Sequence, residues 1–112
     1  MSKVKEINLE YGQPTVERAV QNMVNQLSTC KGQGCKAVIL IHGYGSSGVG
    51  GSIKTAVLKK LQEPFLKGVV RDYCGGEHWQ ERKKAMLDIR PTLAQHSRRF
   101  DGNPGVTVVV LK

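Results

Sequence analysis

A glycine-rich segment next to a histidine is the part of the sequence best suited to chemistry. His42 is followed by residues 43–51, of which five are glycine, and glycine lets a backbone approach a phosphate closely. The segment leads into a predicted helix, whose first N–H groups and positive dipole end favour an anion. Lys54 and Thr55 add a charge and a hydroxyl group to its first turns. We therefore predict a phosphate-binding site formed by Gly43, Tyr44, Gly45, Ser46, Gly48, Gly50, Gly51, Ser52 and Lys54.

Two known catalytic motifs do not fit this segment. A Walker phosphate loop carries lysine directly after its second glycine, whereas here Gly45 and Gly50 are followed by Gly51, and Lys54 comes later. The sequence also has no Gly-x-Ser-x-Gly, the nucleophile elbow of α/β-hydrolases. A third alternative is a flexible connection that binds no ligand. Five glycines exceed what a plain strand-to-helix turn needs, so we favour the phosphate site.

The hydrophobic pattern predicts the elements that position this segment. Apolar residues recur every three or four positions over 16–27, which is typical of a helix with one buried face. Residues 37–41 are all apolar, as in a central strand that is covered on both faces. The predicted order is strand 6–10, helix 16–27, strand 37–41, helix 52–63 with Ser52 as its N-cap and Pro64 as its end, strand 66–73 and strand 106–111.

This order predicts an α/β fold, a two-layer sandwich with a four-stranded mixed sheet and two main helices (βαβαββ). Alternating strands and helices imply a parallel core, to which the last strand adds in the antiparallel direction. Residues 1–112 make a single domain on grounds of length. A partly helical insertion, residues 75–103, precedes the last strand. Its Trp79 either covers the core or stacks on a base of single-stranded nucleic acid.

The charge of the chain favours a nucleic-acid partner. Seventeen Lys and Arg residues stand against nine Asp and Glu, a formal net charge of +8, which attracts phosphate backbones whatever their sequence. We expect Arg98 and Arg99 in the insertion to contact phosphates, although a solvated basic surface is the alternative. The longest apolar run, 37–41, is far short of the ~20 residues that span a membrane. With no secretory signal at the N-terminus, we expect a cytoplasmic protein without a membrane partner.

The three cysteines do not indicate a metal site. None forms a Cys-x-x-Cys pair, and without an export signal they are expected to be reduced. Cys30, Cys35, Cys74 and His78 could supply four zinc ligands. The predicted topology, however, places the first two and the last two at opposite ends of the sheet, while zinc holds its ligands at ~2.0–2.3 Å.

Three segments, in order, resemble the Smr (small MutS-related) domain family. Residues 14–20 resemble its helix start, 41–45 its His-Gly-x-Gly-x-Gly segment, and 105–111 its closing strand. The resemblance implies a two-layer α/β sandwich similar to the C-terminal domain of bacterial translation initiation factor three. It also implies DNA or RNA as the partner and, as in several members, metal-dependent nicking of the backbone.

One family motif is altered in this chain. The first strand of the family usually ends in Leu-Asp-x-His-Gly, whereas here Asn8, Leu9 and Glu10 lead to Tyr11 and no histidine follows. We take Glu10 as the candidate base or metal ligand and His42 as the candidate proton carrier or phosphate donor. Mg²⁺ or Mn²⁺ is implied only for a nuclease. A nicking DNA or RNA endonuclease, a non-catalytic binding module and a protein-interaction domain all stay open.

Overall fold

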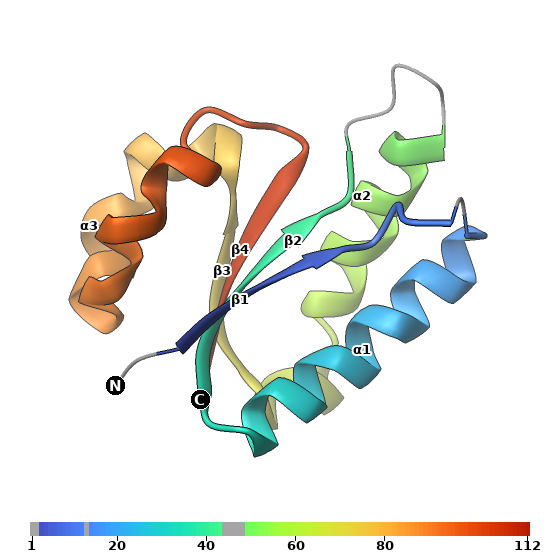
Figure 1. The fold of residues 1–112 in the computed structure, drawn as a ribbon, viewed down its shortest axis with the longest axis horizontal. Coiled ribbons are helices and arrows are strands. Elements are labelled where there is room, and N and C mark those ends of the chain that lie inside the picture. The colour runs from blue at the N-terminus through green and yellow to red at the C-terminus, as the bar shows by residue number, and fades with distance from the viewer. Residues whose placement is uncertain (1–2, 13, 44–48) are drawn as a thin grey trace.

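The computed structural model describes residues 3–12, 14–43 and 49–112. Figure 1 shows four strands that form one sheet, with helices packed beside it. The strands are β1 (Lys3–Asn8), β2 (Cys35–Ile41), β3 (Val70–Gly75) and β4 (Val106–Leu111). The helices are α1 (Val16–Gly32), α2 (Val49–Leu61) and α3 (Trp79–Ile89), together with the 3-10 helices η1 (Pro64–Gly68), η2 (Gly76–His78) and η3 (Pro91–Arg99).

The sheet is mixed, with the strand order β1-β2-β4-β3. β1 and β2 pair in parallel, and β4 is antiparallel to both β2 and β3. The predicted mixed sheet is therefore confirmed. Parallel pairing is confined to β1 and β2, because β4 lies between β2 and β3. β3 still runs in the same direction as β1 and β2, so all three strands end at one edge.

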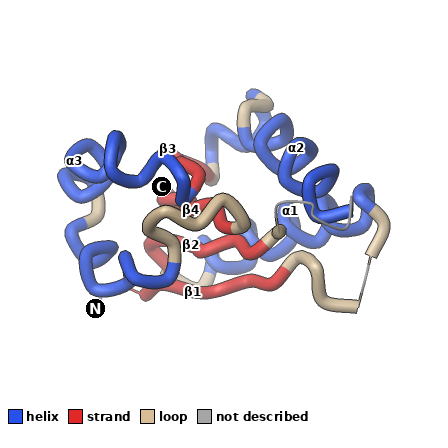
Figure 2. Tube along the Cα trace, turned by 90° about the horizontal axis from the view of Figure 1, so that it is seen from above, coloured by secondary structure: helices blue, strands red, loops and turns tan. Residues whose placement is uncertain are grey.

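Helices cover both faces of the sheet (Figure 2). On one face, α1 and α2 bury Met23, Leu27 and Val57 against sheet residues such as Leu40 and Val109. On the other face, the predicted insertion forms α3 and η3. Its large apolar side chains make a second core with β2 and β4, formed by Trp79, Met86, Leu93, Phe100, Ala37, Ile39, Val108 and Val110.

Trp79 belongs to this second core. Its side chain is 2% exposed, and its ring meets that of Phe100 edge-on, with centroids 4.7 Å apart and planes at 80°. A ring so enclosed cannot stack on a base. Of the two alternatives for Trp79, packing is confirmed and base stacking is wrong.

The helix boundaries follow the sequence signals with one exception. Thr15 caps α1 by accepting the Arg18 N–H at 3.2 Å, and α2 ends before Pro64 as predicted. The predicted cap at Ser52 is wrong, because α2 begins at Val49 and Ser52 is its fourth residue. The helix includes Gly50 and Gly51 although glycine is a poor helix former, so tertiary context overrides local propensity here. None of the described helices is long and apolar enough to cross a membrane.

The sheet has two ends, which we call the loop end and the far end. The loop end holds the last residues of β1, β2 and β3 and the first of β4, because Asn8 pairs with Ile41 and Ile41 with Val106. The far end holds the first residues of β2 and β3 and the last of β4, together with η1.

Candidate functional site

The loop end brings together the predicted site residues from separate elements. Glu10 follows β1, His42 follows β2 and Lys54 lies in the first turns of α2. Glu77, which sequence analysis did not single out, follows β3 in η2. The Glu10 carboxylate lies against Gly43, the residue that follows His42, and Lys54 pairs with Glu77. Glu10 and His42, the two predicted catalytic residues, therefore share one site.

His42 is fully buried, and the protein engages both of its ring nitrogens. Nδ1 lies 2.7 Å from the Gly43 carbonyl oxygen, which can only accept, so Nδ1 carries a proton and donates it. Nε2 lies 2.7 Å from Thr107 Oγ1. Burial lowers the pKa of His42 below its ordinary value of 6.5, against the opposing effect of the hydrogen bond to Gly43. The neutral ring therefore accepts a hydrogen bond from the Thr107 hydroxyl at Nε2.

The backbone next to His42 is held as firmly as its ring. The N–H groups of His42 and Gly43 both donate to the Gly105 carbonyl, at 2.9 and 3.0 Å. Gly43 has a φ of 73°, in the left-handed region that favours glycine. The Glu10 carboxylate lies where a Cβ at Gly43 would stand. The turn favours glycine here, and a larger residue would also displace the exposed Glu10 side chain.

Lys54 forms an ion pair with Glu77 across the loop end. The two side chains are 19% and 29% exposed. Burial by itself would raise the pKa of Glu77, but the hydrogen bond and the charge of Lys54, with a backbone hydrogen bond, hold that pKa below its ordinary value. The lysine predicted to meet a phosphate thus already faces a carboxylate.

The other predicted phosphate-binding residues are placed as follows. Tyr44, Gly45, Ser46 and Gly48 lie outside the described residues, while Gly50 and Gly51 form part of the first turn of α2. Arg98 and Arg99 are exposed at the end of η3. Arg99 pairs with Glu6 of β1 at 3.1 Å. Phosphate contact by any of these residues stays a prediction.

The side chains at the loop end offer few ligands for Mg²⁺ or Mn²⁺. These cations take several oxygen ligands, and Glu10 and Glu77 offer carboxylates. Among the described residues, no group of three or more His, Cys, Asp or Glu side chains is placed to hold a metal ion. Glu77 is moreover engaged by Lys54. The described residues therefore do not fit a divalent cation.

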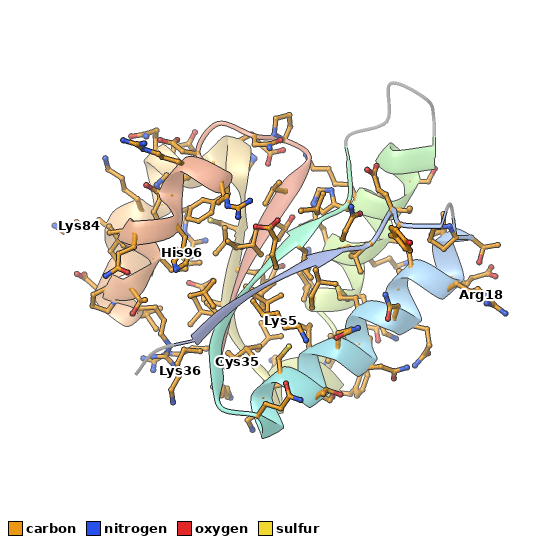
Figure 3. All side chains as sticks on the ribbon, in the orientation of Figure 1. Lys5, Arg18, Cys35, Lys36, Lys84 and His96 are labelled. Atoms are coloured by element: carbon orange, nitrogen blue, oxygen red, sulfur yellow. The ribbon has the colours of Figure 1, made fainter. Side chains whose placement is uncertain are left out.

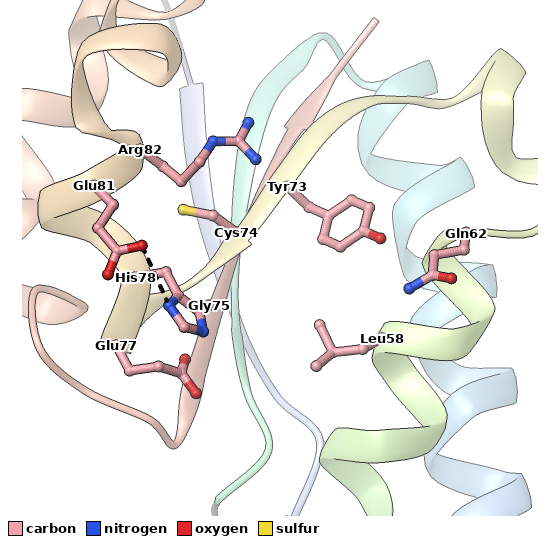
Figure 4. Close-up of a pocket in the computed structure, with 9 residues that line it drawn as sticks. All are labelled: Leu58, Gln62, Tyr73, Cys74, Gly75, Glu77, His78, Glu81 and Arg82. Carbon is pink, nitrogen blue, oxygen red and sulfur yellow. Dashed lines mark ion pairs between the residues drawn. The ribbon is translucent and has the colours of Figure 1, made fainter.

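A cavity of about 310 Å³ opens beside Glu77, between α2 and α3 and over β3 (Figure 4). Leu58 of α2 and Gln62, which directly follows that helix, line one side, and Glu81 of α3 lies on the other. Cys74 also lines the cavity, and burial raises the pKa of its thiol to about 11. At neutral pH this cysteine is an unreactive thiol.

Thr107 and Glu77 belong to the site but were not predicted from the sequence, where each leaves only a weak indication. Thr107 is the only polar residue in β4, and a lone polar residue in a buried strand needs a hydrogen-bond partner. Glu77 follows Gly75, the last residue of β3, and Gly76, the first residue of η2. Because β3 runs parallel to β2, residues after it belong to the same edge of the sheet. Tyr11, 85% exposed next to Glu10, offers an aromatic face at this end.

The comparisons with known proteins agree with this architecture. The model of the Smr domain family matches residues 12–112, so the chain belongs to the Smr domain family. The crystal structure of the Smr domain of Thermus thermophilus MutS2 has the same fold, with a TM-score of 0.56 at 21% identity over 98% of each chain. No curated relative matches the chain. The family match includes residues 75–103 and begins just after Glu10.

Proposed function

We propose that this Smr domain binds nucleic acid and that its loop end contacts the phosphates. One observation carries the proposal: Lys54 and the first turn of α2 stand at the carboxyl ends of β1 and β2. Ligands of open α/β sheets bind at that edge, and a helix start there attracts anions. The net charge of +8 and the membership of the Smr family support the same partner.

In this proposal His42 acts as a positioning residue. Its neutral ring is fixed between the Gly43 carbonyl and Thr107, 65 residues away in the chain. It therefore anchors the beginning of the glycine-rich segment to β4. Lys54 provides the charge for a phosphate, and in doing so it exchanges the Glu77 carboxylate for a phosphate oxygen. The exchange makes binding depend on salt.

Binding is tested by fluorescence anisotropy with labelled duplex DNA, single-stranded DNA and an RNA hairpin, at several salt concentrations. We expect Lys54→Gln to weaken binding severalfold and to lower the slope of log affinity against log salt by about 0.9, the value for one phosphate contact. Lys84→Gln, on the exposed surface of α3, is the matched control and should change little. Absence of binding by the wild-type chain at about 50 mM salt would overturn the proposal and favour a protein partner instead.

Backbone nicking is a second candidate function, favoured by the position of Glu10. Its side chain is exposed at the loop end and lies against Gly43, where a carboxylate could take a proton from an attacking water. For His42 to carry a proton, its ring must release one of its two hydrogen bonds. The buried ring therefore favours Glu10 as the base.

Nicking is tested on supercoiled plasmid and structured RNA, with and without Mg²⁺ or Mn²⁺. We expect Glu10→Gln to abolish cutting and Glu81→Gln, an equal change of charge on α3, to leave it intact. If substrate is cut and both Glu10→Gln and His42→Gln cut at the wild-type rate, the assigned site is wrong.

A further inference from the structure

We propose that the far end of the sheet is a second surface that contacts the nucleic-acid backbone, separate from the loop end. The proposal shares with the proposed function only the class of partner. The far-end surface is defined here by six residues on different elements: Lys31, Lys36, Lys67, Arg71, Arg90 and Lys112.

Hydrogen bonds between these elements bring them to one end of the molecule. Lys31 Nζ at the end of α1 donates to the Gly68 carbonyl of η1 at 2.8 Å. The Arg90 guanidinium donates to the carbonyls of Lys36, at 3.3 Å, and Leu111, at 2.8 Å. The Lys112 N–H donates to the Val69 carbonyl at 2.9 Å. The start of β2, the end of β4 and the region between η1 and β3 therefore meet at this surface.

The cations here exceed the acidic residues. Among the described residues, Lys36, Lys67 and Arg71 are exposed and form no ion pair. The acidic side chains near this end are Glu63, which pairs with Lys60 at 3.0 Å, Asp72, which pairs with Arg82 at 2.6 Å, and Asp88 near the end of α3. At the loop end, in contrast, Lys54 faces Glu77 and Arg99 faces Glu6. Among the described residues, the far end thus carries several exposed cations that no carboxylate neutralises.

A structural role explains some of these residues but not all of them. Lys31 and Lys67 lie in the last turns of α1 and η1, where a cation stabilises the helix end. Lys36 and Arg71 lie at the starts of strands instead, and no helix end accounts for them. Their exposed charges are available to a partner.

The surface fits a phosphate backbone better than a lipid or protein partner. An amphipathic segment that lies on a membrane buries an apolar face, and a protein interface has an apolar centre. Phe65 in η1 is the one large hydrophobic side chain exposed at this end among the described residues, at 61%, with Lys60 Nζ 5.1 Å from its ring centroid. Dispersed cations with a single aromatic ring match a chain of phosphates and bases.

The distance between the two ends suits one nucleic-acid molecule. β2 has seven residues and so spans about 23 Å at ~3.3 Å per residue. A duplex covers that length in about seven base pairs at ~3.4 Å each. One short duplex alongside the sheet can therefore contact both surfaces.

The test compares two double variants with equal loss of charge in the full chain. Lys36→Gln with Arg71→Gln removes two cations from the far-end surface, and Lys83→Gln with Lys84→Gln removes two from the outer side of α3, where Figure 3 shows Lys84 pointing away from the sheet. Labelled duplex DNA and an RNA hairpin are titrated by anisotropy at several salt concentrations. We expect the far-end variant to lose about tenfold in affinity and its salt slope to fall by about 1.8, which is the slope for two phosphate contacts. The α3 variant should stay near wild type.

The other outcomes overturn this proposal in distinguishable ways. If the far-end variant binds as tightly as wild type while Lys54→Gln binds more weakly, the far-end surface does not contact nucleic acid. The proposal for the loop end would then still stand. Equal losses in both double variants would mean that net charge alone matters. Binding to anionic phosphatidylserine vesicles without binding to either nucleic acid would overturn both this proposal and the proposed function. Thermal denaturation of each variant checks that the fold is unchanged.

Discussion

The two ends of the sheet differ in how tightly their residues are held. At the loop end, His42 is buried with both ring nitrogens engaged, and Lys54 and Glu77 neutralise one another. At the far end, Lys36 and Arg71 are exposed and unpaired among the described residues. The family motif lies at one end and these unpaired cations lie at the other. A motif and a net charge in one short sequence can therefore belong to different surfaces.

We expect the largest effect from a glycine-to-alanine substitution, which should destabilise the loop end much more than the far end. A Cβ at Gly76 would collide with the backbone carbonyls of Phe100 and Asn103, while at Gly68 of the far end it would meet nothing within 4 Å. Backbone cannot move aside as a side chain can. We expect Gly76→Ala to lower the free energy of unfolding by about 2–4 kcal/mol and Gly68→Ala to change it by less than about 0.5 kcal/mol.

Urea denaturation of both alanine variants measures this difference. A loss in Gly76→Ala no larger than that in Gly68→Ala would show that the segment between β3 and α3 packs more loosely than the structure indicates. The tight and loose ends would then no longer differ.

A second prediction concerns the hydrogen bond that fixes His42. Thr107→Val keeps the shape of the side chain but removes the hydroxyl that serves Nε2 at 2.7 Å. A buried acceptor left without a donor costs about 1–3 kcal/mol, and we expect the free energy of unfolding to fall by that amount. Val108→Thr would not be a fair control because it buries a new hydroxyl. Thr92→Val, at a half-buried position of η3, is the control and should be nearly neutral.

The loop end should also make stability depend on pH. Burial lowers the pKa of His42 below 6.5 in the folded chain. As the pH falls below that value, the unfolded chain takes up a proton that the folded chain resists, so the free energy of unfolding decreases. Lys54 holds the pKa of Glu77 below its ordinary 4.5, which adds a further loss under more acidic conditions.

Urea titrations between about pH 7 and pH 5 isolate the contribution of His42. We expect wild-type stability to fall over this range and His42→Gln, although less stable at pH 7, to depend less on pH. If both chains lose stability equally, a group other than His42 is responsible.

Much of the fold could be predicted because it depends on local patterns. The apolar run at 37–41 predicted β2, and Pro64 was correctly predicted to end the helix before it. The order of strands could not be predicted in the same way. Nothing in the segment 106–111 indicates that β4 inserts between β2 and β3. That choice depends on contacts between residues far apart in the sequence, which periodicity does not record.

The same limit applies to the candidate site. His42 could be found because it follows a buried strand and precedes five glycines. Its burial could not, since the partner of Nε2 is Thr107 in the last strand. The ion pair of Lys54 likewise depends on Glu77, 23 residues away on another element. The residue types at the loop end indicated which groups could bind a phosphate. Only the tertiary structure showed that the charge of Lys54 is already neutralised by Glu77.

The smallest effect is expected from removing the carboxylate that neutralises Lys54. Glu77→Gln releases Lys54 and should lower the free energy of unfolding by less than about 1 kcal/mol, since such a partly exposed pair contributes little. We expect the same variant to bind duplex DNA severalfold more tightly, because a free ammonium no longer has to exchange a carboxylate for a phosphate. Glu81→Gln removes an equal charge from an exposed position of α3 and should raise affinity less. If the two variants gain equally in anisotropy titrations, the added charge acts over the whole chain. Lys54 would then not be restrained by Glu77, and the loop end would not differ from the far end in the way described above.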